Sequence, residues 1–219
     1  MIVFCYFGKT KFQKMSSRTP LKKGSSKLIN AWAFYDWANS VYSLVISSAI
    51  FPIYYGVIFS DVNTINILGY QLKNTAVISF LTAVAFLIIA FFSPILSGIA
   101  DYIGNKKKFM KIFVYLGSFS CIGLYWFELE TIYLGLFFYF FAMIGLWSSL
   151  VFYNSYLPDI AYPEQQDRAS ARGFSYGYVG SVILLLANLA MIMQPNLFGI
   201  EGDKADASVQ AMKFSFVSV

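Results

Sequence analysis

The chain has 219 residues, of which 58% are hydrophobic, 20% aromatic and only 12% charged, and its net charge is +5. A soluble domain carries about 25% charged residues, so this composition excludes an ordinary soluble domain and indicates an integral membrane protein. The chain has no histidine and its two cysteines, Cys5 and Cys121, are far apart, so we expect neither a metal site, nor histidine-based catalysis, nor a cofactor.

Residues 1–29 are predicted to form a basic tail. Its short apolar run, MIVFCYF, comes before the lysines, which is the reverse of the order in a secretory signal, so no signal peptide is expected. In a membrane protein, such a tail fits contact with anionic lipid rather than binding to nucleic acid.

Five apolar blocks are each long enough to cross a hydrocarbon core, which takes about 20 helical residues. They are predicted as helices at about residues 31–59, 75–100, 109–127, 131–153 and 174–193, and a sixth begins near Lys213. An apolar segment cannot stop halfway across a bilayer with unpaired backbone groups, so we expect an incomplete copy of a larger protein. The predicted fold is an all-α polytopic membrane helix bundle over residues 30–219, with five full helices and a truncated sixth.

The distribution of lysine and arginine predicts the orientation of the helices. Thirteen of the 16 basic residues lie in the N-terminal tail and in the second and fourth connections. Basic connections stay on the cytoplasmic side, so the N-terminus is expected in the cytoplasm, with the helices alternating from there. For a bacterial protein, the location would be the cell membrane.

The first helix carries a polar face. Asp36, Ser40, Ser43 and Ser47 recur at the spacing of one helical face, and Asn39 lies next to them. A polar face in a membrane should point into the bundle or into a water-filled cavity. We therefore predict that Asp36, Asn39, Ser40 and Ser43 line a transport path or couple transport to an ion.

Plainer interpretations of the same face remain open. The serines can bond the carbonyls of their own helix and permit close packing, and Trp32 and Trp37 can act as anchors at the membrane surface. The strictly apolar run begins at Val41, which places Asp36 only about 7 Å before it at ~1.5 Å per residue. This depth favours the cytoplasmic interface over the middle of the membrane.

The second and fourth connections pair acidic with basic residues. The second, SGIADYIGNKKKF, holds Asp101, a glycine for a tight reversal at Gly104, and Lys106 and Lys107. The fourth is a long polar loop, from Asn154 to Gly173, and we expect a cytoplasmic gate in which Asp101 pairs with one of its arginines. Its candidate gate residues are Asp159, Arg168 and Arg172. The alternative is a loosely charged, solvated loop, in which exposed pairs contribute little.

The fifth helix carries small residues at every fourth position and one deep amide. Ala169, Gly173, Gly177 and Ser181 allow another helix backbone to approach closely. Asn188 lies deep in the apolar run, where it needs a partner, and we predict either a bond to another helix or a place on the transport path. Lesser candidates on the fourth helix are Trp147, Ser148 and Ser149.

Three motifs carry a resemblance to a known family. The second connection resembles the G-x-L-A-D-R-x-G-R-R loop of the major facilitator superfamily: Asp101 and Gly104 match, whereas Ser97 and Tyr102 depart from it. NAWAFYDWANS and YNSYLPDIAYPEQQDRASARGFSYGYVGS resemble the vacuolar-effluxer branch, which holds the autophagy-related vacuolar amino-acid effluxers of fungi and their bacterial relatives. The resemblance implies two six-helix halves, of which this chain supplies the N-terminal one, and helices one, two, four and five lining a central cavity.

The leading hypothesis is therefore a secondary active transporter of a small polar metabolite. Amino acids as the substrate come from the resemblance alone, and Asp36 is the first carboxylate to examine if protons are the coupling ion. The alternatives are a cation-coupled sugar-type symporter of the same superfamily, a membrane enzyme, which the absence of histidine and of a nucleophile motif disfavours, and a structural or non-functional fragment. Expected partners are the lipid bilayer, a small-molecule substrate, and either a missing C-terminal half or a second copy of the chain.

Overall fold

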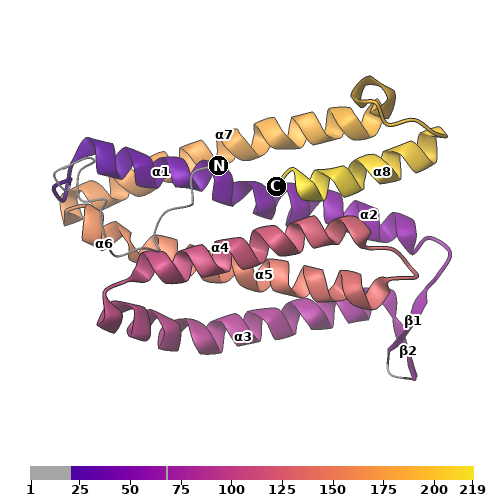
Figure 1. Ribbon diagram of the computed structural model, residues 1–219, viewed down its shortest axis with the longest axis horizontal. Coiled ribbons are helices and arrows are strands. Elements are labelled where there is room, and N and C mark those ends of the chain that lie inside the picture. Colours follow the sequence, from indigo (N-terminus) through magenta and orange to yellow (C-terminus); the bar gives the residue numbers. More distant parts are fainter. Residues whose placement is uncertain (1–20, 68) are drawn as a thin grey trace, which may run out of the picture.

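The computed structural model describes residues 21–67 and 69–219, so most of the predicted basic tail, Cys5 included, lies outside the described residues. Within that part, five helices are long and apolar enough to cross a membrane. The chain is an all-α, multi-pass membrane helix bundle (Figure 1), as its composition predicted. The five spans are Ser26–Ile58, Asn74–Ile103, Lys106–Trp126, Ile132–Ile160 and Pro163–Met193.

The first span is one continuous helix with three parts. It consists of α1 (Ser26–Val41), a π-helical stretch η1 (Tyr42–Ile50) and α2 (Phe51–Ile58). The backbone N–H of Phe51 reaches back to the carbonyl of Ile46, five residues earlier. Pro52 follows directly; it lacks an N–H and its ring displaces the carbonyl four residues before it. The wider hydrogen-bond pattern thus lies directly before a proline, a common cause of a helix kink.

A short hairpin joins the first span to the second. Strands β1 (Thr64–Ile67) and β2 (Tyr70–Lys73) pair antiparallel, and α3 (Asn74–Ile103) begins directly after them. Helix α3 is capped by Gly104, whose φ of 69° is a conformation that glycine adopts at little steric cost. The tight reversal predicted at Gly104 is confirmed. Helix α4 (Lys106–Gly123) then starts with Asn105 as its N-cap.

The third and fourth spans are antiparallel neighbours joined by a short connection. A 3-10 turn, η2 (Leu124–Trp126), ends the third span, and α5 (Ile132–Ser155) begins a few residues later. A Cβ added to Gly145 of α5 would overlap the backbone nitrogen of Gly117 on α4. The two helices therefore meet backbone to backbone.

The fourth connection is almost entirely helical, which corrects the prediction of a long polar loop from Asn154 to Gly173. Helix α5 continues to Ser155, the single turn α6 (Leu157–Ile160) follows, and α7 (Pro163–Met193) begins at Pro163 rather than at Phe174. Proline suits a first helical position, and the Oε1 of Gln165 accepts a hydrogen bond from the N–H of Tyr162 at 3.1 Å. The polar residues after Pro163 belong to helix.

The last helix begins earlier than predicted. After η3 (Pro195–Phe198), α8 (Lys204–Val217) starts at Lys204 rather than at Lys213, because polar residues fill its first two turns. It returns along α7, and the C-terminus lies near the middle of the bundle (Figure 1). An aromatic core that includes Phe51, Tyr54, Phe127 and Phe216 joins α2, the α4–α5 connection and α8.

Candidate functional site

Asp36 is buried where α1 packs against α7, and only 4% of its surface is exposed. Its Oδ2 lies 3.1 Å from the place that a Cβ on Gly177 would take and 3.7 Å from the corresponding place on Gly173. Ser40 faces Gly177 as well, and a Cβ there would overlap its Oγ. The polar face of the first helix therefore points into the bundle, against the small-residue stripe of α7.

Aromatic side chains close this site on the α5 side. The Trp32 ring stacks on the Tyr153 ring with centroids 4.4 Å apart and planes 5° apart, and its Nε1 donates to the Tyr153 carbonyl at 3.0 Å. The Tyr153 hydroxyl lies 3.1 Å from the position of a Cβ on Gly173, beside Asp36, and it is buried with no hydrogen-bond partner in the described part of the chain. Trp32 thus packs between helices, and Trp37 packs on Gly180 of α7.

Asp36 has no cationic partner in the part of the chain that the structure describes. The ion pairs there involve Lys106 and Lys213 only, while Arg172, the nearest arginine along α7, donates to the Oδ1 of Asn30. Isolated buried charges are costly, and ionisable groups inside membrane spans commonly belong to proton relays or substrate paths. Asp36, Ser40 and Tyr153 therefore form a buried polar cluster between α1, α5 and α7.

The other predicted path residues lie elsewhere. Ser43 is half-buried in η1, where its carbonyl accepts a hydrogen bond from Ser48. Asn188 is buried on α7 and exchanges hydrogen bonds with Ser218, at the end of α8, at 3.1 and 3.2 Å. The interhelical bond predicted for Asn188 is confirmed, and its place on a transport path stays a prediction.

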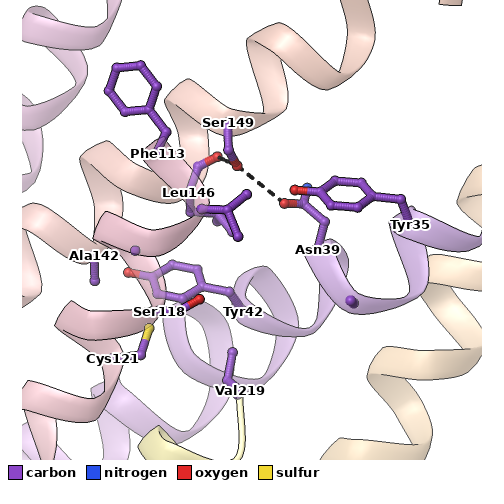
Figure 2. A pocket seen from close by; sticks show the side chains of 13 residues that line it. Tyr35, Asn39, Tyr42, Phe113, Ser118, Cys121, Ala142, Leu146, Ser149 and Val219 are labelled. Atoms are coloured by element: carbon purple, nitrogen blue, oxygen red, sulfur yellow. Dashed lines mark hydrogen bonds between the residues drawn. The ribbon is translucent and has the colours of Figure 1, made fainter. Parts of the chain in front are cut away.

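Asn39 lines a cavity of about 140 Å³ between α1, η1, α4 and α5 (Figure 2). Its Oδ1 accepts a 3.4 Å hydrogen bond from Ser149 of α5, whose hydroxyl also donates to the carbonyl of Leu146. Tyr42 enters the cavity from η1 and Cys121 from α4. Val219, the last residue of the sequence, also lines this cavity, and the place of Asn39 on a transport path stays a prediction.

The second and fourth connections meet through Lys106. Its Nζ lies 3.0 Å from Asp101 and 2.9 Å from Asp159, and it also donates to the carbonyl of Ser155 at 3.1 Å. This Lys106 bridge ties the α3–α4 turn to the end of α5 and to α6. It replaces the predicted pair between Asp101 and an arginine, because Lys106 follows the reversal at Gly104 and reaches Asp101 directly.

The remaining predicted gate residues do not join this bridge. Lys107 and Arg168 are exposed, and Arg172 pairs with Asn30 as described above. The exposed position of Lys107 follows from its place one residue after Lys106, which turns it to another face of α4.

Sequence reasoning missed a strap formed by the residues before α1. The N–H of Gly24 donates to the carbonyl of Ile160 at 2.8 Å, and the Nε2 of Gln165 donates to the carbonyl of Gly24 at 3.2 Å. The Nζ of Lys23 donates to the carbonyl of Pro158 at 2.5 Å. A glycine among lysines before the first helix was the only local signal, and it does not say which segment it meets.

Comparison with known proteins decides the family. The chain matches the family described as vacuole effluxer Atg22 like over residues 24–216. The chain belongs to this vacuole effluxer Atg22-like family. The predicted resemblance to the vacuolar-effluxer branch of the major facilitator superfamily is therefore confirmed, and the match contains α1, α7 and the Lys106 bridge.

Two curated relatives of this Atg22-like chain are bacterial. An uncharacterized MFS-type transporter of Bacillus subtilis (strain 168), YxiO, is 36% identical over 173 residues, which cover 79% of this chain and 39% of that protein. An uncharacterized protein of Aquifex aeolicus (strain VF5) is 30% identical over 190 residues, or 86% of this chain and 44% of that protein. The chain thus spans less than half the length of these relatives, and no solved structure matches it significantly.

Proposed function

We propose that this Atg22-like bundle is the N-terminal six-helix half of a secondary active transporter, which moves a small polar metabolite across a membrane by alternating access. Family membership and the transporter description of the Bacillus relative support transport. Amino acids are the proposed substrates because of the effluxer family alone. A second half, or a second copy of the chain, would complete the path.

The observation that carries a coupling role is the burial of Asp36 without a cation among residues 21–67 and 69–219. The carboxylate is 4% exposed, and Ser40 and the unpartnered hydroxyl of Tyr153 are the polar groups beside it. An ionised carboxylate accepts a hydrogen bond from a neighbouring hydroxyl, whereas a protonated carboxyl group can donate one. The protonation state of Asp36 can therefore favour one arrangement of α1 and α7 over another. We assign Asp36 as the proton-carrying group of the transporter.

The Lys106 bridge fits the proposed gate at the end of the bundle that holds the start of α1. It connects three segments, the α3–α4 turn, α5 and α6, that would have to separate when this end opens. The Gly24 strap lies against the same α6–α7 junction. Opening would therefore break several polar contacts together, which favours two discrete states.

The experiment compares Asp36→Asn with Asp61→Asn in proteoliposomes that contain the transporter. Asp61 is an exposed aspartate just after α2, so it is a matched control outside the site. With a panel of radiolabelled amino acids, we expect Asp36→Asn to lose at least ~10-fold of the uptake driven by a pH gradient, a typical loss for a proton-transfer group, and Asp61→Asn to retain it. Full gradient-driven uptake by Asp36→Asn contradicts the coupling role, and no uptake of any amino acid by the unmodified protein contradicts the substrate class.

A further inference from the structure

The Tyr153 hydroxyl is a buried polar group that lacks a partner. Only 4% of the Tyr153 surface is exposed, and its hydroxyl oxygen is sealed from water with no hydrogen-bond partner among the described residues. Buried hydroxyl groups are normally hydrogen-bonded, and an exception calls for an explanation. Since no space for a water molecule adjoins this oxygen, its partner is expected among the protein groups that a small shift of the helices brings within reach.

Asp36 offers an acceptor at the same place. A Cβ on Gly173 would lie 3.1 Å from the Tyr153 hydroxyl oxygen and 3.7 Å from the Oδ2 of Asp36. The two oxygens thus approach one position of α7 from α5 and from α1, and Gly173 has no side chain to hinder them. In the described arrangement the hydroxyl is not hydrogen-bonded, so a bond between the two belongs to a second arrangement of these helices.

The other groups around Asp36 differ from Tyr153 in the helix that carries them. Tyr35 and Ser40 lie near the carboxylate, but they belong to the same helix and move with it. Helix α7 contributes glycines at this contact, and its nearest basic residue, Arg172, donates to an asparagine of α1. Tyr153 reaches the carboxylate from a different helix. A hydrogen bond between Asp36 and Tyr153 therefore depends on how α5 lies against α1.

Two aromatic side chains of α1 hold the Tyr153 ring in place. The Trp32 ring stacks on it with centroids 4.4 Å apart, and the Tyr35 ring centroid lies 5.1 Å away. The Nε1 of Trp32 also donates to the Tyr153 carbonyl at 3.0 Å. Because the ring is clamped, its hydroxyl cannot swing to a distant acceptor and follows the last turn of α5 instead.

The last turn of α5 also reaches the Lys106 bridge. Helix α5 ends at Ser155, two residues after Tyr153, and the Ser155 carbonyl accepts a hydrogen bond from the Nζ of Lys106 at 3.1 Å. The N–H of Tyr156 donates to the Tyr153 carbonyl at 3.2 Å, at the step from α5 to α6. A shift of Tyr153 toward Asp36 would therefore move an acceptor of the Lys106 bridge.

We propose that Tyr153 is a positioning residue for Asp36, and that its hydroxyl donates a hydrogen bond to the ionised carboxylate and thereby ties the charge of Asp36 to the last turn of α5. A hydrogen bond to an ionised group is roughly twice as strong as one between neutral groups, so protonation of Asp36 weakens this bond and releases the turn. The proposal rests on the proposed function, because it needs Asp36 to gain and lose a proton. It adds the residue through which that proton acts on the Lys106 bridge.

Infrared difference spectroscopy of the purified protein in nanodiscs follows the protonation of Asp36 directly. The carbonyl stretch of its protonated form is assigned by its absence in Asp36→Asn, and its intensity against pH gives a midpoint. In Tyr153→Phe the ionised carboxylate loses a hydrogen-bond donor, so this midpoint is expected to rise by about one pH unit. Tyr139→Phe is the matched control on the same helix, because the Tyr139 hydroxyl pairs with Thr82 at 3.2 Å, and it should leave the midpoint unchanged.

Two further measurements test the contact and its consequence. Gly173→Ala keeps both polar groups, but its Cβ would lie against both oxygens, so it should raise the midpoint as well, and it replaces Tyr153→Phe if that variant does not fold. Amide hydrogen exchange over residues 155–161 is corrected for the intrinsic effect of pH. It is expected to change severalfold across the midpoint in the unmodified protein and to lose this change in Tyr153→Phe.

The possible results separate this proposal from the proposed function. An unchanged midpoint in Tyr153→Phe and Gly173→Ala overturns the role of Tyr153 while Asp36 still titrates, and so does hydrogen exchange that ignores the protonation of Asp36. An equal shift in Tyr139→Phe would show a general loosening of α5 and overturns the role as well. If no carbonyl band both titrates with pH and disappears in Asp36→Asn, Asp36 does not carry the proton, and the proposed coupling fails together with this proposal.

Discussion

At the scale of single residues, the α1–α7 contact depends on missing side chains on α7. Gly173 and Gly177 leave the space in which Asp36, Ser40 and Tyr153 lie. Contact this close between membrane helices is a common use of small residues, because van der Waals packing replaces the hydrophobic effect there. The same absence of a side chain gives Asp36 its buried position.

Adding one methyl group at this contact should destabilise the protein. In Gly177→Ala, the new Cβ overlaps the Oγ of Ser40 and lies 3.1 Å from the Oδ2 of Asp36, so we expect a loss of about 1–3 kcal/mol in the free energy of unfolding. Thermal unfolding in detergent, followed by intrinsic fluorescence, measures it. The control is Gly98→Ala on α3, where a Cβ meets nothing within 4 Å. Equal melting temperatures for the two variants contradict this account of the contact.

Spacing along the sequence predicted both faces of this contact but not that they meet. The stripe of Gly173 and Gly177 and the polar face of Asp36 and Ser40 each follow from helical periodicity. Periodicity gives the angular position of a residue on its own helix, whereas the choice of partner helix depends on the packing of the whole bundle. The place of Tyr153 beside Asp36 depends on a third helix, and it was missed for that reason.

At the scale of helices, α7 shows where composition misleads. Its first turns carry Glu164, Gln165, Asp167 and Arg168, which resemble a loop when only membrane-spanning hydropathy is considered. A helix can extend past the apolar region if its polar residues remain exposed, and Asp167 and Arg168 are exposed. The boundary was therefore predicted too late, although the span itself was predicted correctly.

The Lys106 bridge should restrain α6. In Lys106→Met, the contacts with Asp101, Asp159 and the Ser155 carbonyl are lost, and we expect amide hydrogen exchange over residues 155–161 to accelerate severalfold. The carboxylates are about half exposed, so solvent screening limits the loss of global stability to at most about 1 kcal/mol. Lys107→Met, at the exposed neighbouring lysine, is the matched control. Unchanged exchange in Lys106→Met would show that α6 is held by other contacts.

At the scale of the whole molecule, the bundle has two chemically different ends. One end gathers the start of α1, the α3–α4 turn, α6 and the start of α7 (Figure 1), and the lysines and arginines of these segments lie there. The other end holds the hairpin and the α4–α5 connection, with Glu128 and Glu130. This asymmetry is the basis for predicting a cytoplasmic N-terminus.

Labelling of single cysteines tests this orientation. In a background with Cys5→Ser and Cys121→Ala, we place one cysteine at each end by Lys107→Cys and Glu130→Cys, both at exposed positions. A membrane-impermeant maleimide should label Glu130→Cys on intact bacterial cells and Lys107→Cys only after permeabilisation. The reverse pattern would show that the bundle has the opposite orientation in the membrane. Labelling of both cysteines after permeabilisation verifies that each site is reactive.

The π-helical stretch η1 has a mechanical consequence for the first span. Its hydrogen bonds skip one more residue than those of an α-helix, so η1 stores surplus chain within a continuous helix. If one turn of η1 converts to α-helix, α2 rotates about the helix axis relative to α1 without a break in the chain. Asp36 and Asn39 lie on one side of this joint and the aromatic core around Phe51 lies on the other. A change of η1 from π- to α-helical hydrogen bonding would therefore turn Phe51 about the helix axis relative to Asp36.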